Sequence, residues 1–183
     1  MKKLLIGTVV LLATTGWAMG VGFSLPAVTE AAAGSTVEIE VSAVGQGTIA
    51  GSNLSLQVDE PLEIVGLDLL AGVFAENNTG QIILLNSTHP VDIPAPQYAV
   101  GAVTTNSGTV ATPGLLAKVS VLIPVGTPDG DYTILTQIPG VQGSDWAGSA
   151  VVDSLGAGII RVPEPMTAIL LLAGLSLLRR RHA

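Results

Sequence analysis

The sequence predicts an all-β sandwich, and three observations support this prediction. Short stretches alternate strictly between apolar and polar residues, as half-buried strands do. Glycine and proline clusters separate these stretches at intervals typical of sandwiches and barrels. Aromatic residues make up only 3% of the chain, so the core must be built from Val, Ile, Leu and Ala. That composition favours sheets over helices.

The clearest strand runs over 36–43, where every odd-numbered residue is apolar and every even-numbered residue is polar. Such a pattern places one face in a core and the other in water. The segment 54–58 repeats it, with Leu54, Leu56 and Val58 as the apolar face. Between the two chain ends, only Asp68 to Asn77 has room for a turn of helix. Three more strands are predicted in this half of the chain: 62–67, 81–85 and 98–103.

The second half of the chain continues the same pattern. Residues 117–123 alternate, with Ala117, Val119, Val121 and Ile123 on one face. The strand 132–136 follows the turn sequence Thr-Pro-Asp-Gly, and a last strand is predicted over 158–162. Together with the earlier segments, these stretches predict a sandwich of about nine strands.

The N-terminus has the features of a secretory signal peptide over residues 1–20. Lys2 and Lys3 form a basic start, and the apolar stretch from Leu4 to Thr15 follows. Ala18 and Gly20 then supply small residues at the spacing of a cleavage site. We expect a signal helix with cleavage after Gly20, with cleavage after Ala18 as the alternative. The protein is therefore predicted to be exported.

The C-terminal segment 163–183 combines three features. Pro163, Glu164 and Pro165 form a stiff break in the chain, because proline cannot continue a regular element. An uncharged apolar segment, 166–178, predicts a transmembrane helix. The basic cluster Arg179, Arg180 and Arg181 would stay on the cytoplasmic side, leaving everything before Pro163 outside.

The apolar segment is short for a permanent anchor. Thirteen helical residues rise about 20 Å, whereas the hydrocarbon core of a membrane is about 30 Å thick. The alternatives are an ordinary short anchor and a buried core helix.

By residue order, this tail resembles the PEP-CTERM sorting signal of Gram-negative bacteria. That resemblance implies recognition by an exosortase, a membrane enzyme that removes the tail near Pro163, Glu164 and Pro165. It also implies a transient stage at the inner membrane, followed by release to the cell surface or extracellular matrix.

Residues 21–162 remain between the two signals, enough for one domain with a core of its own. This segment contains thirteen carboxylates and only two basic residues, Lys118 and Arg161, so its formal net charge is −11. Such a surface repels phosphate backbones, which excludes nucleic-acid binding. The chain has no cysteine, so disulfides and cysteine-based metal sites or nucleophiles are also excluded.

Several segments of this domain resemble cohesin modules in the same order. The similarity begins at Ala33 to Val37, continues through Ile49 to Val65, and returns at Leu116 to Val121 and Thr127 to Ile134. The resemblance implies a jelly-roll sandwich of nine strands. It also implies either binding of a dockerin-like protein through one sheet face or a role as a carbohydrate-associated surface module.

Two features are candidates for binding chemistry. Asp129 and Asp131 flank Gly130 and offer hard oxygen ligands for calcium, although the same residues predict a simple β-turn. Trp146 offers an indole for stacking on a sugar such as an exopolysaccharide. The alternative is that Trp146 packs at one end of the sandwich, since large aromatic residues are usually buried.

Catalytic constellations are weak in this sequence. The acidic pairs Asp59 with Glu63 and Asp129 with Asp131 have the residue types for glycoside hydrolysis, but their neighbours mark turn carboxylates. His89 lies in a proline-rich stretch without a nucleophile motif. We therefore expect a non-enzymatic binding or structural module without a required cofactor. The alternatives are a polysaccharide-active enzyme and a purely structural matrix protein.

Overall fold

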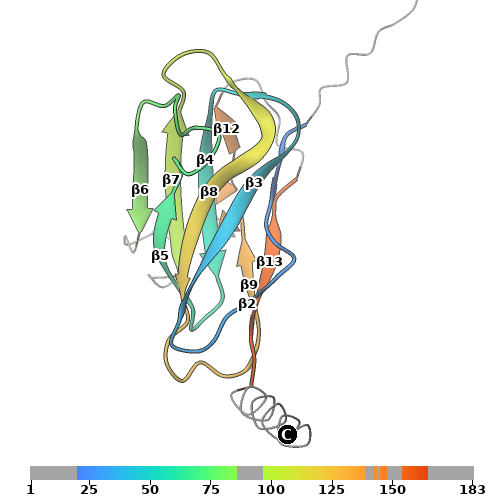
Figure 1. Cartoon of the computed structure of the whole chain (residues 1–183), viewed down its shortest axis with the longest axis vertical. Helices are drawn as coiled ribbons and strands as arrows, with labels where there is room; N and C mark the ends of the chain where they lie inside the picture. The colour runs from blue at the N-terminus through green and yellow to red at the C-terminus, as the bar shows by residue number, and fades with distance from the viewer. Residues whose placement is uncertain (1–19, 86–96, 139–141, 144, 148–153, 165–183) are drawn as a thin grey trace, which may run out of the picture.

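Figure 1 shows two β-sheets packed face to face, which is the architecture that the alternating sequence predicts. The computed structural model describes residues 20–85, 97–138, 142–143, 145–147 and 154–164. Every regular element within these ranges is a β-strand. The predicted signal helix, apart from Gly20, and the predicted membrane helix lie outside the described residues.

The small sheet is built around two long strands that contain the clearest alternation in the sequence. Its strand order is β1-β3-β8-β5, and all neighbours run antiparallel. The register of β3 with β8 places Ile39 opposite Val119 and Val41 opposite Ala117, so these apolar side chains share the inner face. The four strands are β1 (Gly22–Ser24), β3 (Thr36–Ile49), β5 (Glu63–Asp68) and β8 (Val110–Leu122).

The large sheet lies behind the small sheet in Figure 1 and has the order β2-β13-β9-β4-β7-β6, with β12 paired to β4. Its neighbours run antiparallel, except that β13 and β2 are parallel. Its strands are β2 (Val28–Glu30), β4 (Gly51–Val58), β6 (Gln81–Leu85), β7 (Tyr98–Thr104), β9 (Gly130–Leu135), β12 (Asp145–Ala147) and β13 (Ala157–Val162). A separate ribbon joins β10 (Gln137–Ile138) and β11 (Gln142–Gly143).

The first strand of the domain crosses from one sheet to the other. Strand β1 pairs with β3 in the small sheet, whereas β2 pairs with β13 in the large sheet. Pro26 lies between β1 and β2 and has no N–H to donate, so a ladder cannot continue through it. The crossing therefore joins one edge of each sheet.

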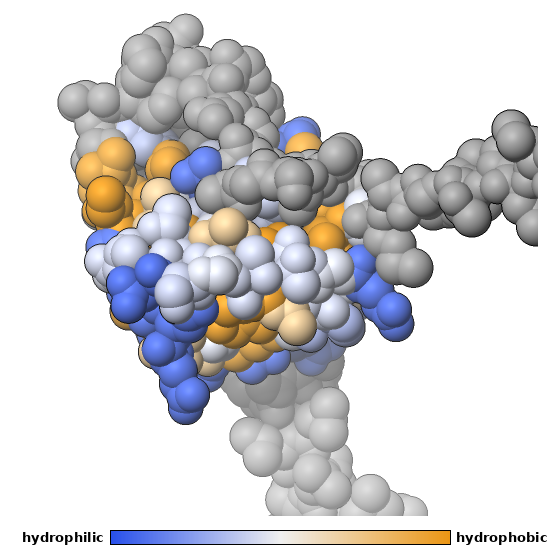
Figure 2. Space-filling view, turned by 90° about the horizontal axis from the view of Figure 1, so that it is seen from above, coloured by the Kyte–Doolittle hydropathy of each residue, from blue (hydrophilic) through white to orange (hydrophobic). Residues whose placement is uncertain are grey.

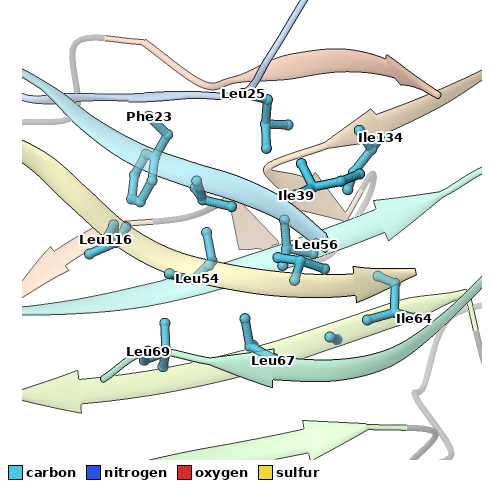
Figure 3. Close-up of a cluster of buried hydrophobic side chains, with 14 of the residues drawn as sticks. Phe23, Leu25, Ile39, Leu54, Leu56, Ile64, Leu67, Leu69, Leu116 and Ile134 are labelled. Atoms are coloured by element: carbon cyan, nitrogen blue, oxygen red, sulfur yellow. The ribbon is translucent and has the colours of Figure 1, made fainter. Parts of the chain in front are cut away.

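The core is a layer of aliphatic side chains between the sheets, shown in Figure 3. Leu54 and Leu56 on β4 are completely buried, and Ile39 on β3 approaches them from the small sheet. Burying a side chain of this size stabilises the fold by about 1.5–3 kcal/mol. Because the chain contains no cysteine, packing of this kind must supply most of the stability.

The two sheets approach closely at Gly101 on the inner face of β7. A methyl group added there would lie 2.8 Å from both Leu67 Cδ2 and Leu69 Cδ1. Two carbon atoms do not approach to that distance without displacement. A glycine at this position therefore allows the leucines of β5 and of the turn after it to fill the space between the sheets.

The all-β prediction is confirmed, and the eight predicted strands correspond to β3 to β9 and β13. The segment 81–85 matches β6 at both ends, whereas β8 begins seven residues before the predicted 117, at Val110. The prediction of a turn of helix within Asp68 to Asn77 is wrong, because the residues after β5 form turns and bends. The short strands β1, β2 and β10 to β12 were not predicted, because two or three residues are too few to show alternation.

We expect Leu56→Ala to destabilise the domain by about 2–5 kcal/mol, because it removes a completely buried side chain and leaves a cavity. Leu84→Ala makes the same chemical change at a side chain that is 52% exposed, and should alter stability by less than about 0.5 kcal/mol. Urea unfolding of both variants measures the difference. Equal losses would contradict the assignment of Leu56 to the core and Leu84 to the surface.

Candidate binding surface

The outer face of the large sheet carries exposed aliphatic residues along β6 and β7. In β7, Ala99, Gly101 and Val103 point inward, so Val100 and Ala102 point outward. Strand β6 places two large side chains beside them: Ile82 lies opposite Ala102, and Leu84 lies opposite Val100. We call these four outward residues the β6–β7 patch: Ile82, Leu84, Val100 and Ala102.

The two large side chains of the β6–β7 patch are unusually exposed for aliphatic residues. Ile82 is 69% exposed and Leu84 is 52% exposed, although both are large aliphatic residues. Figure 2 shows hydrophobic residues at the surface on the side where β6 lies, which is the left in both views. At one end of the patch, a shallow recess of about 180 Å³ lies between Thr79–Ile82 and Ala102–Thr104. Exposed aliphatic side chains that lie side by side make this surface a candidate interaction site.

The outer face of the large sheet is not exposed along its whole width. Tyr98 and Ser55 also point outward by alternation, yet they are only 1% and 4% exposed. Tyr98 is absent from the core cluster between the sheets, which agrees with its outward direction. Exposure is therefore concentrated at β6 and the adjoining part of β7.

The outer face of the small sheet has the opposite character. Lys118 on β8 donates a hydrogen bond of 2.7 Å to Glu38 on β3. This bond and the charge of Glu38 raise the pKa of Lys118, and the nearby carboxylates Glu40 and Asp68 raise it further. The face is thus hydrated and acidic, with a solvent-exposed ion pair that contributes little to stability.

Asp131, one of the two calcium candidates, is bound by a guanidinium group. Strands β9 and β13 place Arg161 directly opposite Asp131, and Arg161 donates hydrogen bonds of 2.7 and 3.0 Å to its two carboxylate oxygens. Asp129 is exposed in the preceding turn. Within the described residues, no group of three or more acidic or histidine side chains is placed to hold a metal ion. This geometry gives the calcium hypothesis no support.

Trp146, the candidate for sugar stacking, is a core residue that is only 6% exposed. Its ring stacks on Phe23 with centroids 4.1 Å apart, and its indole N–H donates a hydrogen bond of 2.7 Å to the carbonyl of Val21. An indole that is held in this way offers no face to a sugar. The structure therefore corrects the ligand-contact hypothesis for Trp146 and agrees with the alternative, packing within the sandwich.

The acidic pair Asp59 and Glu63 is not arranged as free catalytic groups. Asp59 Oδ2 accepts a hydrogen bond of 2.7 Å from the backbone N–H of Thr133, and the Asp59 N–H donates to the Thr133 carbonyl. Asp59 thus ties the end of β4 to β9. Glu63 begins β5 in the other sheet. His89 lies outside the described residues.

The domain ends directly at the predicted sorting motif. Val162, the last residue of β13, is only 2% exposed, whereas the next two residues, Pro163 and Glu164, are exposed. A recess of about 430 Å³ lies where the chain leaves the sandwich, lined by Val162–Glu164, Gly126–Asp129 and Ala32–Ala33.

Most residues of the two predicted targeting signals lie outside the described residues. No helix among the described residues is long and apolar enough to cross a membrane. The predicted membrane segment 166–178 lies outside the described residues. The same holds for the following candidate residues: Ala18, Pro165, Arg179, Arg180 and Arg181.

Several solved structures of similar fold are cohesin modules. The chain is similar to the third ScaB cohesin of R. flavefaciens, solved in complex with a group 1 dockerin: TM-score 0.58, 20% identity, 80% of this chain and 97% of that chain. It is also similar to a non-cellulosomal cohesin of Archaeoglobus fulgidus, with a TM-score of 0.55, 18% identity, and coverage of 81% and 95%. The domain has a cohesin-like fold.

A third neighbour of this cohesin-like domain is CaCohA2 of Clostridium acetobutylicum. Its TM-score is 0.57 at 16% identity, covering 78% of this chain and 90% of that chain. No protein-family profile and no curated protein sequence matches the chain. The expectation of a cohesin-like sandwich is thus confirmed at the level of the fold.

Nothing in the sequence indicates that Ile82 and Leu84 are exposed. Residues 82–85 form a continuous aliphatic run, and such a run is typical of a strand buried on both faces. The exposure of Ile82 and Leu84 in the structure shows that one face of β6 is uncovered.

We expect the pKa of Asp131 to lie below that of an ordinary aspartate, because its carboxylate accepts hydrogen bonds from Arg161 and is attracted by its charge. Arg161→Gln should return this pKa toward the ordinary value. The lowered folded-state pKa means that the stabilisation is present above the unfolded-state pKa and disappears as the pH falls through the folded-state pKa. A carbon-13 NMR titration of the Asp131 carboxyl group measures both values.

One result of the titration would contradict the ion pair between Asp131 and Arg161. If the pKa of Asp131 is the same with and without Arg161, the ion pair across β9 and β13 does not persist in solution. Asp131 would then be available as a cation ligand.

Proposed function

We propose that the protein is an exported, non-enzymatic binding module of the cell surface or extracellular matrix. Its proposed partner is a dockerin-like protein that docks on the β6–β7 patch. The observation that carries the proposal is the exposure of Ile82 and Leu84 on the outer face of a cohesin-like sheet. A similar fold has been solved in complex with a group 1 dockerin.

The chemistry of the patch favours a protein over a polysaccharide. All four of its side chains are aliphatic, and carbohydrate sites generally use exposed aromatic rings for stacking. Trp146 and Tyr98 are both buried in this domain. A flat aliphatic face with a polar surround is instead the usual centre of a protein–protein interface.

The negative charge of the domain favours a partner that carries basic residues around its apolar contact surface. The formal net charge of −11 over 21–162 creates a negative field around the apolar patch. A partner with basic residues bordering an apolar centre would be attracted to this field, and the association would slow as salt rises.

In each acidic pair that suggested an enzyme, one carboxylate is bound by other parts of the domain. Asp59 is held by the backbone of Thr133, and Asp131 is held by Arg161. Both carboxylates therefore serve the fold, and neither stands in a cleft as a free acid or base.

The two predicted targeting signals would bring such a module to its site of action. The signal peptide would export the chain, and the PEP-CTERM tail would deliver it to an exosortase at the inner membrane of a Gram-negative bacterium. Pro163 and Glu164 are exposed immediately after the last buried residue of the domain, Val162. A processing enzyme could therefore reach the motif without unfolding the sandwich.

A capture experiment with matched variants tests the binding face. The wild-type protein, the double variant Ile82→Lys with Leu84→Lys, and the control Val65→Lys are immobilised and exposed to the host's surface fraction. Val65 is 42% exposed but belongs to the small sheet, so its variant introduces a lysine without altering the patch. We expect a dockerin-like protein to be retained by the wild type and the control and to be lost from the double variant.

Two results of the capture experiment would count against the proposal. Equal retention by all three proteins would place the binding site away from the β6–β7 patch. Retention of a polysaccharide in place of a protein would favour the carbohydrate-associated role.

Intact mass of the protein from the native host tests the sorting proposal. We expect a mass that begins near Val21 and ends near Pro163, found in the surface or medium fraction. A mass that still includes Arg179 to Ala183, found in the inner membrane, would show that the tail is a retained anchor.

Substituting Glu164 by Ala should slow processing if the motif is read by a protease, while leaving the fold intact because this side chain is exposed.

A further inference from the structure

The edges of the two sheets differ in how they resist pairing with another strand. An exposed edge strand offers unpaired backbone groups, and proteins usually block it with short length, charge, proline or a bulge. Strands β1 and β2 are edges of only three residues each. Strand β5 has charged residues at both ends, Glu63 and Asp68, and an irregular register between Ile64 and Gly66.

Strand β6 has none of these protective features. It is five residues long, contains no charge and no proline, and keeps a regular register with β7 from Gln81 to Leu85. In the described part of the chain, β7 is its only strand neighbour. Its exposed side chains, Ile82 and Leu84, are aliphatic. Among the described residues, no strand pairs with the second backbone edge of β6, and the outer face of the strand is apolar.

We propose that β6 pairs antiparallel with β6 of a second copy of this protein, across a two-fold axis that passes through Ile83. In that register Ile82 lies opposite Leu84 of the second copy, and Leu84 lies opposite Ile82 of the second copy. Each cross-strand pair is aliphatic, so the large sheets of both copies form one continuous sheet with a shared apolar strip. A two-fold arrangement of this kind is self-complementary and closes at a dimer.

The charge of the domain favours a second copy at this edge and disfavours one elsewhere. With a net charge of −11, two copies repel each other over most of their surfaces. No residue of β6 is ionisable, so pairing along it places no like charges directly opposite each other. Charged residues at the ends of β5 would face their counterparts if that edge were used instead.

Dimer formation and partner binding use overlapping but different parts of the molecule. The dimer depends on the backbone edge of β6, whereas the proposed partner covers the outer face of β6 and β7. Val100 belongs to the outer face but lies on β7, away from the open edge. Val100→Lys should therefore weaken capture of the partner and leave the dimer unchanged.

Engineered cysteines test the register directly, because the natural chain has no cysteine. Two purified mature variants, Ile82→Cys and Leu84→Cys, are oxidised separately and as a mixture. Residues directly opposite across an antiparallel pair have Cβ atoms about 4.5–5.5 Å apart, whereas diagonal neighbours are about 7–8 Å apart. Disulfides require Cβ atoms about 3.5–4.5 Å apart, so the mixture should cross-link several times faster than either variant alone.

Val65→Cys is the control, because its side chain is also exposed but lies on the other sheet. If this variant cross-links as fast as the mixture, the reaction reports random collisions and the proposal is overturned. Equal rates for the mixture and for the separate variants would overturn the proposed register.

Sedimentation velocity tests the dimer without cysteines. The wild type and Val100→Lys should form a dimer as the concentration rises from micromolar to millimolar, and the double variant Ile82→Lys with Leu84→Lys should remain a monomer. A wild type that remains a monomer throughout this range would overturn the proposal, whatever the capture experiment shows for the dockerin-like partner.

Discussion

Close packing of aliphatic side chains between the two sheets is the constraint on which the rest of the structure depends. The chain has no cysteine, and its described residues hold no cluster that could bind a metal. Few aromatic side chains contribute, and the stacked pair Phe23 and Trp146 is one place where they do. The aliphatic layer must therefore be continuous, which explains why Gly101 occurs where the leucines of the opposite sheet come within contact distance.

This constraint also determines what the surface can display. Once alternate residues of each strand are committed to the core, the remaining residues face outward as a set, because side chains along a strand alternate between faces. In the small sheet the outward set is mainly polar and charged, as Glu38 and Lys118 show, and Val65 is an exposed exception. In the large sheet the four outward residues of the β6–β7 patch are aliphatic. The exposed part of β6 and β7 thus differs in chemistry from the outer face of the small sheet.

Sequence reasoning could predict the strands and their inward faces because both depend on local alternation. It placed Val41 and Leu56 in the core, and both are buried. It could not predict pairings between distant strands, such as the one that brings Asp131 to Arg161, because no local pattern encodes them. It also could not tell whether an outward face is covered: Tyr98 and Leu84 both point outward, but only Leu84 is exposed.

Hydrogen exchange of the mature protein with and without the host's surface fraction is the most direct test of the central claim, that the outer face of β6 and β7 is the functional surface. The protein is kept dilute, so that pairing of two copies does not itself protect β6. Our account predicts that exchange slows in peptides covering 81–85 and 98–104 and does not change in β3 and β8. Slowing in β3 and β8, with 81–85 unaffected, would contradict it and assign binding to the acidic face of the small sheet.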